Sequence, residues 1–404
     1  MHALLPKPSA LAGHWSISPD VVYLNHGSYG ACPTAVLDAQ TAIRARMERE
    51  LVEFFMIDME RMLDDARARI GGFLGCRAQD LAPTRNATQA IAAVIAHLDL
   101  GPGDEILIND HEYSSCLNEF ARSGAQHGFK VVTAGVPFPS STDRIADALL
   151  ARVTPSTKAA LISVITSPTA MIFPIDRVVA ELRERGIVTI IDGAHAAGQI
   201  PVNIESIGCD FYAGVFHKWA CAPKGTGYLW VHPDRQDGFE PLALSSRAHI
   251  HRDDRARFNY LFDYVGTDDY TGWLTVPGAI DIMASLVPGG WDEIRTRNHD
   301  LVIAGRKIIC ERLGVEPPLE DSLVPSMATI ILPGAGAESG GIKPGGYEDP
   351  MQQTLVEKWR IQVPVWSLPS TRQRLLRISA QLYNSIEQYE YLAEALAEEL
   401  AQPI

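Results

Sequence analysis

The sequence lacks both an excess of basic residues and any long apolar segment. Its formal net charge is −14 and its pI is near 5.3. Because a nucleic-acid-binding protein usually presents a basic face, we expect no nucleic-acid partner. No apolar run reaches the roughly 20 residues that a membrane-spanning helix needs, so we expect no membrane partner. Residues 1–20 lack a basic start followed by a long apolar core, which favours a cytoplasmic protein without a secretory signal.

The sequence also lacks the patterns that are typical of a disulfide framework, a nucleotide-binding loop and a metal site. None of the six cysteines forms a CxxC pair, which argues against a disulfide framework and favours reduced thiols. There is neither a GxGxxG segment after a first strand nor a GxxxxGK(S/T) loop, so a nucleotide-binding α/β protein would lack its phosphate cradle. His249 and His251 have strand spacing, but no carboxylate or cysteine clearly completes a metal site, so we predict no metal.

What the sequence does contain is an alternation of strand and helix patterns through its first two-thirds. Helical stretches such as 145–153 and 176–184 separate several of the strands, and this α/β pattern predicts a mostly parallel sheet with helices on both faces. In such sheets ligands bind beyond the carboxyl ends of the strands. The strand candidates are 106–108, 130–133, 159–165, 188–191, 211–215 and 227–231.

A chain of 404 residues has room for a large domain and a smaller one. We expect a large domain over residues 21–285 and a small α+β domain over residues 286–404, with residues 1–20 forming an N-terminal arm that joins the small domain. Helical periodicity covers about 35–73, and a helix over 273–286 links the two parts. The small domain should contain strands 328–332 and 375–379, a loop or disordered insert over 333–350, and a closing helix over 386–401.

Lys218 and Asp192 are the most informative residues. Lys218 follows an apolar strand-like run beside His217, and Asp192 closes another such run. This pair indicates a pyridoxal phosphate (PLP) site, in which the lysine holds the aldehyde as a Schiff base and the acid keeps the pyridine nitrogen protonated. Alone, Asp192 is equally a helix cap. Lys224 competes for the lysine role, but it lies in a turn.

Other polar residues at strand ends and helix starts complete this hypothesis. The helix start at 86–88 suits a phosphate, although many helices begin with Asn as a plain cap. A ring stacked on the cofactor is assigned to Tyr113, with His111 as the alternative. Ser167 is a candidate for a contact with the phenolic oxygen, and His195 for a contact with that oxygen or with the substrate. His217 is a candidate for a contact with the phosphate.

Arginines supply candidates for substrate recognition. Arg377 lies in a strand-like run of the small domain and can bind a carboxylate through two parallel hydrogen bonds, although a surface arginine has similar odds. The cluster of Arg247, Arg252, Arg255 and Arg257 is typical of a solvated face, and its alternative role is to meet a second acid group on a substrate.

Together these segments resemble the class V aminotransferase family of fold-type I PLP-dependent enzymes, most closely its isopenicillin N epimerase-like branch. The resemblance spans about residues 23–397 and implies a large domain with a seven-stranded, mostly parallel sheet. It implies that Lys218 is the Schiff-base lysine, that Asp192 pairs with the pyridinium, and that Tyr113 takes the place of the stacking ring. The segments that carry it are 23–30, 86–88, 101–107, 192–195, 217–218, 262–268 and 377–384.

The resemblance also implies roles for residues that no local pattern singles out. Ala87, Thr88 and His217 fall at phosphate contacts, and Arg377 falls on the arginine that binds the substrate carboxylate. Asn25 and His26 line the substrate side. Gly266 and Thr267 complete the phosphate site of a neighbouring subunit, which implies a homodimer.

Several reactions remain open. All begin with removal of the Cα proton by Lys218, which leads either to an amino-acid epimerase or to a C–S β-lyase acting on a cysteine S-conjugate, with a class V aminotransferase as the alternative. Epimerisation needs a second acid, for which Tyr113, His26 and His111 are candidates. Cysteine desulfurases carry a loop cysteine before the conserved arginine, whereas no cysteine follows Cys310 here, so that reaction ranks low. A PLP-binding protein without turnover is disfavoured because Lys218, Asp192 and Arg377 are all intact.

Overall fold

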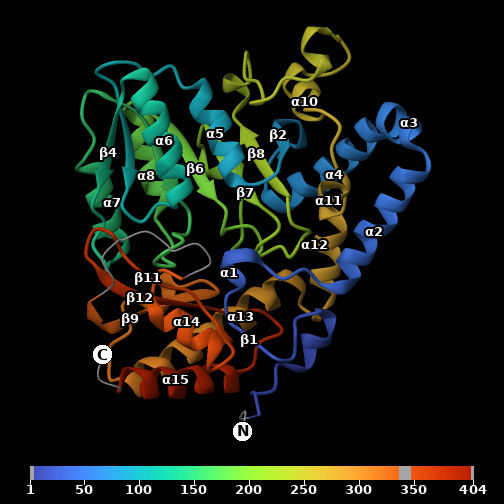
Figure 1. Ribbon diagram of the computed structural model, residues 1–404. Coiled ribbons are helices and arrows are strands. Elements are labelled where there is room, and N and C mark those ends of the chain that lie inside the picture. The colour runs from blue at the N-terminus through green and yellow to red at the C-terminus, as the bar shows by residue number, and fades with distance from the viewer. Residues whose placement is uncertain (1–3, 336–346, 402–404) are drawn as a thin grey trace.

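The larger part of the molecule is built around a seven-stranded sheet (Figure 1). The computed structural model describes residues 4–335 and 347–401. The strand order is β2-β8-β7-β6-β5-β3-β4, and all strands are parallel except β8, which runs antiparallel to both neighbours. The predicted mostly parallel sheet is confirmed. The strands are β2 (Leu81–Thr84), β3 (Glu105–Asn109), β4 (Lys130–Ala134), β5 (Thr157–Ser163), β6 (Val188–Gly193), β7 (Phe211–Val215) and β8 (Gly227–Val231).

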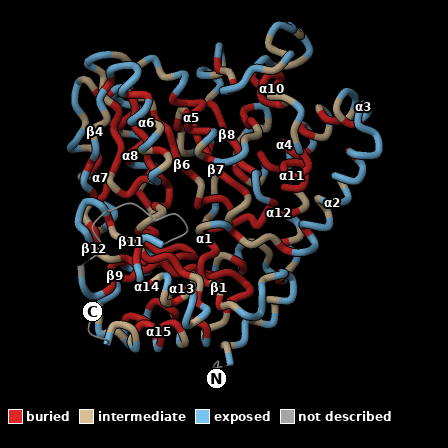
Figure 2. The backbone as a smooth tube through the Cα atoms, in the orientation of Figure 1, coloured by how far each residue is buried: buried red, intermediate tan, exposed pale blue. Residues whose placement is uncertain are grey.

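Each face of this sheet is covered by helices because successive strand residues point to opposite sides. On one face, Ile106 and Leu161 pack with α5 (Ala87–His97) and α6 (Ser114–His127). On the other, Leu107 and Ile162 pack with α7 (Thr142–Leu150) and α8 (Ile175–Glu184). Figure 2 shows the resulting buried layer along the sheet. Both faces of the inner strands are therefore apolar, as a parallel sheet requires.

The helical stretch expected over 35–73 is interrupted. It consists of α2 (Thr34–Arg49), α3 (Leu51–Glu53), a π-helical turn (Phe54–Asp58) and α4 (Met59–Leu74). The break occurs at Glu50, whose φ of −140° and ψ of 59° are not helical. Leu51, Val52, Met56 and Ile57, which we call the apolar tip, are exposed where this hairpin projects from the molecule (Figures 1 and 2).

The C-terminal part packs against the lower edge of the first in Figure 1. It contains a three-stranded antiparallel sheet of β9 (Met327–Ala335), β12 (Gln373–Ser379) and β11 (Val365–Ser367). Its helices are α13 (Gly290–Leu313), α14 (Pro350–Glu357) and α15 (Ile386–Leu400), and it is reached through α11 (Thr271–Leu274) and α12 (Val276–Ser285). Most of the predicted 333–350 insert, residues 336–346, lies outside the described residues.

Residues near the N-terminus join this second part. β1 (Val22–Tyr23) pairs in parallel with β10 (Ile361–Gln362), and the backbone N–H of Ser9 donates to the carbonyl of Tyr383 at 3.1 Å. Trp15 packs edge-on against the ring of Tyr383, with 5.2 Å between centroids. Of the helices in the described ranges, none combines the length and apolar character needed to cross a membrane.

Candidate active site

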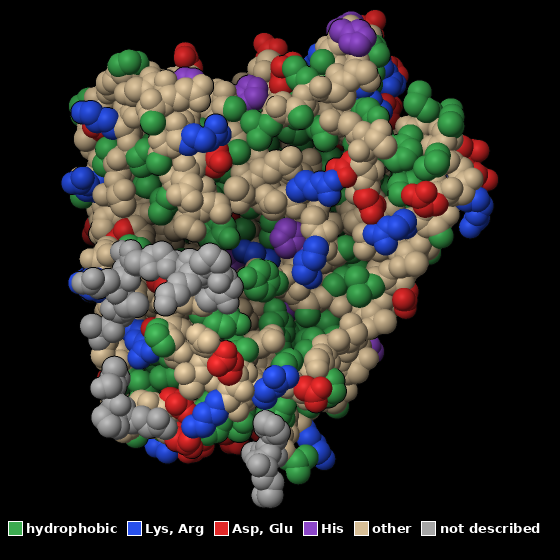
Figure 3. Space-filling view, viewed as in Figure 1, with side chains coloured by type: hydrophobic (Ala, Val, Ile, Leu, Met, Phe, Trp, Pro, Cys, Tyr) green, Lys and Arg blue, Asp and Glu red, His purple; other side chains and the backbone are tan. Residues whose placement is uncertain are grey.

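A cavity of about 350 Å³ lies at the carboxyl ends of β5, β6 and β7, where β12 of the C-terminal part faces them. Figure 3 shows the molecule hollowed between its two parts, with histidine and basic side chains at the hollow. The structure brings together nine of the predicted site residues in the cavity wall: Ala87, Thr88, Tyr113, Ser167, Asp192, His195, His217, Lys218 and Arg377.

Lys218 lies three residues beyond β7 and projects into this cavity. Its Nζ is 3.1 Å from Nε2 of His195. Burial lowers the pKa of Lys218 to about 8, while the charge of Asp192 opposes the shift and that of Arg377 adds to it. A substantial fraction of neutral amine is therefore present near neutral pH, which is the state that a nucleophile or base requires.

The proton position on His195 is set by Trp219. The indole N–H donates to Nδ1 of His195 at 3.2 Å, and an indole can only donate. Burial holds the pKa of His195 well below its usual range, so the ring is neutral and carries its proton on Nε2. That N–H points at Lys218, and it can donate to the lysine only when the amine is neutral.

Asp192, the next-to-last residue of β6, is a buried carboxylate without a cationic partner among the described residues. Its Oδ1 accepts the backbone N–H of Ala194 at 2.8 Å, and its Oδ2 has only the thiol of Cys116 at 3.8 Å. Among the described residues no lysine, arginine or histidine nitrogen lies within 4 Å of it, and burial raises its pKa. A buried, unpaired carboxylate is costly, so the site fits a protonated ring nitrogen at this position.

The start of α5 supplies unused donors at the other end of the cavity. The side chain of Asn86 accepts the N–H of Gln89 at 2.8 Å and leaves the N–H groups of Ala87 and Thr88 without a partner in the helix. Beside them, Nδ1 of His217 is buried and has no hydrogen-bond partner in the described part of the chain, and burial lowers the pKa of this ring to about 4. Free N–H groups at a helix N-terminus fit a phosphate group.

Tyr113 lines the cavity, and His111 does not. Tyr113 is 46% exposed in the cavity wall, and the centroid of its ring lies 6.0 Å from Nζ of Lys218. His111 is completely buried, where its nitrogens bond Thr169 at 2.8 Å and the carbonyl of Val136 at 3.0 Å. The alternative of His111 as stacking ring or second acid is therefore wrong.

Arg377 is a buried cation that faces the cavity from β12. Its Nη1 donates to the carbonyl and hydroxyl of Ser167 at 2.6 and 3.1 Å, and its Nη2 donates to Ser28 at 2.9 Å. Its Nε has no partner, and no carboxylate lies within 4 Å among the described residues. The guanidinium also stacks on Trp366, 4.9 Å from the ring centroid. A guanidinium held only by neutral groups fits a carboxylate ligand.

Asn25 and His26 stand behind the cavity and do not line it. His26 is fully buried, donates from Nε2 to the carbonyl of Lys218 at 3.0 Å, and accepts at Nδ1 from Tyr383 at 2.9 Å. Burial lowers its pKa to about 3. His26 therefore holds the lysine backbone, and it is not positioned to be the second acid. Asn25 accepts the hydroxyl of Ser28 at 2.6 Å.

Sequence reasoning missed Ser28 and Trp366, which both contact Arg377. Ser28 falls inside the segment 23–30 that carries the family resemblance, so a signal for it existed. Trp366 lies on β11, whose three residues carry no recognisable pattern, and only the antiparallel pairing with β12 brings it to the site.

The arginine cluster and Lys224 are occupied elsewhere. Arg247 stacks on the rings of Tyr260 and Tyr264, and each of the other arginines bonds carboxylates or backbone carbonyls of the same chain. The cluster is therefore not free to meet an acid group on a substrate. Lys224 donates from Nζ to the carbonyl of Gly30 at 2.6 Å and does not line the cavity.

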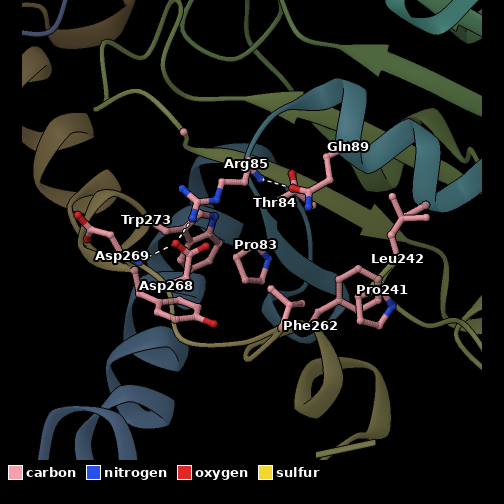
Figure 4. A pocket seen from close by; sticks show the side chains of 14 residues that line it. Pro83, Thr84, Arg85, Gln89, Pro241, Leu242, Phe262, Asp268, Asp269 and Trp273 are labelled. Atoms are coloured by element: carbon pink, nitrogen blue, oxygen red, sulfur yellow. Dashed lines mark hydrogen bonds and ion pairs between the residues drawn. The ribbon is translucent and has the colours of Figure 1, made fainter. Parts of the chain in front are cut away.

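Gly266 and Thr267 do not line the cavity that contains Lys218. They flank a smaller hollow of about 100 Å³ that includes Arg85 and Asp268. Figure 4 shows Arg85 pointing at Asp268, with which it forms an ion pair, while its backbone N–H donates to Gln89 at 2.8 Å. The segment 266–268 is thereby held beside the residues that precede α5.

Comparison with known proteins agrees with this geometry. Residues 23–317 match the family Aminotransferase class-V. The chain is 33% identical to isopenicillin N epimerase of Amycolatopsis lactamdurans over 398 residues, covering 95% of this chain and 96% of that protein. It is 30% identical to putative L-cysteine desulfhydrase 1 of Oryza sativa subsp. japonica, covering 93% and 82%.

The fold is shared with solved structures at lower identity. A cystine C–S lyase in complex with its product, cysteine persulfide, superposes with a TM-score of 0.76 at 20% identity, covering 94% of this chain and 97% of that one. The cysteine desulfurase CsdA of Escherichia coli gives a TM-score of 0.73 at 20% identity, covering 96% and 97%. From its sequence, its fold and the residues around its cavity, the chain belongs to the class V aminotransferase family and is a PLP-dependent enzyme of fold type I.

Proposed function

We propose that the protein acts on an α-amino acid by removing its Cα proton with the amine of Lys218. PLP, when bound, withdraws electrons from Cα and so lowers the barrier to losing that proton. The observation that supports this function most is the placement of the Lys218 amine and the Arg377 guanidinium in the walls of one cavity. A base and a carboxylate-binding group are the two elements that such a substrate needs.

Arg377 orients the substrate through its α-carboxylate. Its position is fixed by Ser167, Ser28 and the face of Trp366. Because these partners are neutral, a carboxylate can compensate the charge of the guanidinium through charge-assisted hydrogen bonds. Holding that end of the substrate sets which Cα bond faces Lys218.

In this proposal His195 and Asp192 contact the cofactor. Asp192 pairs with the ring nitrogen. His195, fixed by Trp219, presents Nε2–H to an oxygen acceptor next to Lys218. Ala87, Thr88 and His217 bind the phosphate, and Tyr113 covers the ring. Ser167 accepts a hydrogen bond from Arg377 and retains its own proton for the phenolic oxygen.

The favoured outcome is epimerisation. Inversion at Cα requires a second acid that delivers a proton to the face opposite Lys218. With His26 and His111 fixed elsewhere, Tyr113 is the remaining candidate of the three, and its hydroxyl has no hydrogen-bond partner within the described residues. The identity of 33% to isopenicillin N epimerase over nearly the whole chain supports this assignment.

A C–S β-lyase is the second candidate. Here the same Cα deprotonation is followed by loss of a sulfur substituent at Cβ, and no second acid at Cα is needed. The relatives named L-cysteine desulfhydrase, which match 94% or 93% of this chain, favour this alternative. Transamination requires reprotonation at the cofactor and remains the third outcome.

We also propose that the enzyme is a homodimer in which Gly266 and Thr267 complete the phosphate site of the partner subunit. In a two-fold interface, if one residue contacts a second across the axis, the second contacts the first in the other copy. The segment 266–268 and the start of α5 lie side by side on one surface. A two-fold contact at this surface would bring the segment 266–268 of each subunit close to the start of α5 in the partner.

The apolar tip supports the dimer. Val52, Met56 and Ile57 are 75%, 76% and 72% exposed. They adjoin the same surface, because Phe55 packs edge-on against Tyr270 with 6.3 Å between ring centroids. A clustered exposure of large apolar residues is typical of an interaction surface.

A cytoplasmic location is proposed as well, supported by six thiols that are all free.

One experiment tests the function. The PLP-loaded protein is incubated in D2O with L- and D-amino acids and cysteine S-conjugates, and Cα–H exchange, configuration, pyruvate and keto-acid are followed. Exchange with inversion and without pyruvate supports epimerisation, whereas pyruvate with a released thiol supports the lyase. Dependence on an added keto-acid supports transamination. Absence of Cα–H exchange with every substrate contradicts the proposal.

The Lys218 assignment is tested in the same preparation. Borohydride should fix PLP covalently to the wild-type chain and not to Lys218→Ala. Lys224→Ala is the matched control, and it should be labelled like the wild type. Labelling of Lys218→Ala would overturn the assignment.

A further inference from the structure

Asn25 is a buried polar residue at the start of α1 (His26–Tyr29), and its side chain does not cap that helix. An asparagine at a helix start usually accepts a backbone N–H of the first turn. Here the amide oxygen of Asn25 instead accepts the hydroxyl of Ser28 at 2.6 Å. Asn25 does not line the cavity, whereas Ser28 does. The amide of Asn25 therefore lies one hydrogen bond away from the cavity wall.

The direction of the Ser28 hydroxyl follows from its two partners. Its oxygen accepts a hydrogen bond from Nη2 of Arg377 at 2.9 Å, and a guanidinium can only donate. The hydroxyl proton of Ser28 is therefore left for the amide oxygen of Asn25. Because hydrogen bonds in such a chain polarise one another, the bond to Asn25 makes the Ser28 oxygen a better acceptor for the cation.

Hydrogen bonds from its own backbone hold the segment 24–28 against β12. The carbonyl of Leu24 accepts the N–H of Ser379 at 2.9 Å, and the N–H of Gly27 donates to the hydroxyl oxygen of Ser379 at 3.1 Å. Ser379 ends β12, the strand that carries the guanidinium. These bonds do not involve the side chain of Asn25, so its removal should free the hydroxyl without moving the chain.

We propose that Asn25 is a positioning residue for substrate recognition, which acts through the hydroxyl of Ser28 to hold the Arg377 guanidinium in the orientation that binds a carboxylate. Without the amide of Asn25 the hydroxyl is free to rotate, and the cation loses an acceptor of fixed direction. The inference deepens the proposed function and rests on the role of Arg377 in it. The purely structural alternative is that Asn25 only begins α1.

The experiment compares how PLP-loaded variants bind L-alanine, which has a carboxylate, and L-alaninamide, which has none. Binding is followed by the absorbance of the bound cofactor. Ser28→Ala should bind L-alanine about tenfold more weakly, at the lower end for loss of a hydrogen bond to a charged group. Asn25→Ala should bind it about threefold to tenfold more weakly, as for loss of a hydrogen bond between neutral groups. Binding of L-alaninamide should not change in either variant.

The double variant Asn25→Ala with Ser28→Ala tests whether Asn25 acts through Ser28. It should bind L-alanine no more weakly than Ser28→Ala alone, because the bond between the two side chains is already lost, whereas independent effects would multiply. Asn298→Ala is the matched control. Asn298 is also buried and donates to Gln381 at 3.0 Å, and it is not a hydrogen-bond partner of Arg377. This variant should bind both probes like the wild type.

Each outcome decides between the roles. Wild-type affinity of Asn25→Ala for L-alanine, an equal loss for both probes, or multiplied effects in the double variant would overturn the inference and leave the proposed function intact. Unchanged binding of L-alanine by Arg377→Ala would instead overturn the proposed role of Arg377. If Asn25→Ala does not fold, Asn25→Ser replaces it, because serine suits a helix start but is too short to reach the hydroxyl of Ser28. The same selective loss for L-alanine is expected, and its absence would also overturn the inference.

Discussion

At the scale of single residues, the cavity contains a buried cation and a buried anion that do not pair with each other. Arg377 is held by neutral oxygens and an indole face, and Asp192 by a backbone N–H and a thiol. Burial of unpaired charge destabilises a protein unless a ligand compensates it. In the function proposed above, the two charges mark the places where substrate and cofactor bind, so both ligands should stabilise the fold by linkage.

Replacement of Arg377 should weaken substrate recognition. Arg377→Ala removes a bidentate charged contact of about 1.5–3 kcal/mol, so KM should rise by roughly tenfold to more than a hundredfold. Arg377→Lys keeps the charge but loses the planar fork, and an intermediate effect is expected. Steady-state kinetics measure both. Arg312→Ala, which breaks an exposed pair with Glu394, should leave the kinetics unchanged, and unchanged kinetics in Arg377→Ala would exclude carboxylate binding by this residue.

The lowered pKa of Lys218 predicts how the stability of the PLP-free protein depends on pH. The unfolded lysine titrates near its usual value of 10.5 and the folded one near 8. Between these values the unfolded chain binds more protons, so the free energy of unfolding should rise with pH from about 8 to 10.5. Melting temperatures of the wild type minus those of Lys218→Met isolate this contribution. A difference that is constant across the window would contradict the lowered pKa.

The positions of strand-end residues were predictable, while their hydrogen-bond partners were not. Asp192, Lys218 and Tyr113 follow apolar runs, and the rule that ligands bind at carboxyl ends of parallel strands places them together. Whether His26 faces the cavity or the back of Lys218 depends on how the N-terminal segment packs, and no local pattern encodes that.

At the scale of elements, the regular pattern of the inner strands made six of the seven strands predictable. β2 was missed because it is short and contains Pro83, which is tolerated since β2 is an edge strand of the sheet. The long helix α13 was missed, because charged residues interrupt its apolar pattern. The helical stretch over 35–73 has one periodicity but breaks at Glu50, because the chain turns there into the apolar tip.

Substitution of two glycines by alanine should change the stability of the protein in opposite directions. Gly193 ends β6 beside Asp192, and a Cβ there would lie 2.2 Å from the buried ring of Tyr212. Gly193→Ala should destabilise the protein by about 1–3 kcal/mol or more, and should weaken PLP binding by displacing Asp192. Gly72 is exposed inside α4 with open space around it, so Gly72→Ala should stabilise by about 0.5–1 kcal/mol. Melting temperatures and PLP titrations check both, and a stabilised Gly193→Ala would refute the packing described for β6.

At the scale of the whole molecule, the proposed dimer links the apolar tip to the cofactor. Because the tip and the segment 266–268 share one surface, a charge placed on the tip should separate the subunits and reduce phosphate binding in both. The double variant Val52→Asp with Ile57→Asp should sediment as a monomer, bind PLP more weakly and lose most of its activity. Leu4→Asp, at a 99% exposed position away from this surface, is the control. A fully active monomer would contradict the proposal.

The hydrogen bonds behind Lys218 connect residues that are far apart in the chain. The carbonyl of Lys218 accepts a hydrogen bond from His26, and His26 accepts one from the hydroxyl of Tyr383. The position of this peptide group therefore depends on two segments that lie more than 350 residues apart in the sequence. Arg377 belongs to the same late segment. The segment that carries Arg377 and Tyr383 must therefore leave the ribosome before the pocket for the vitamin-derived coenzyme is complete, and capture of the coenzyme should follow synthesis of that segment.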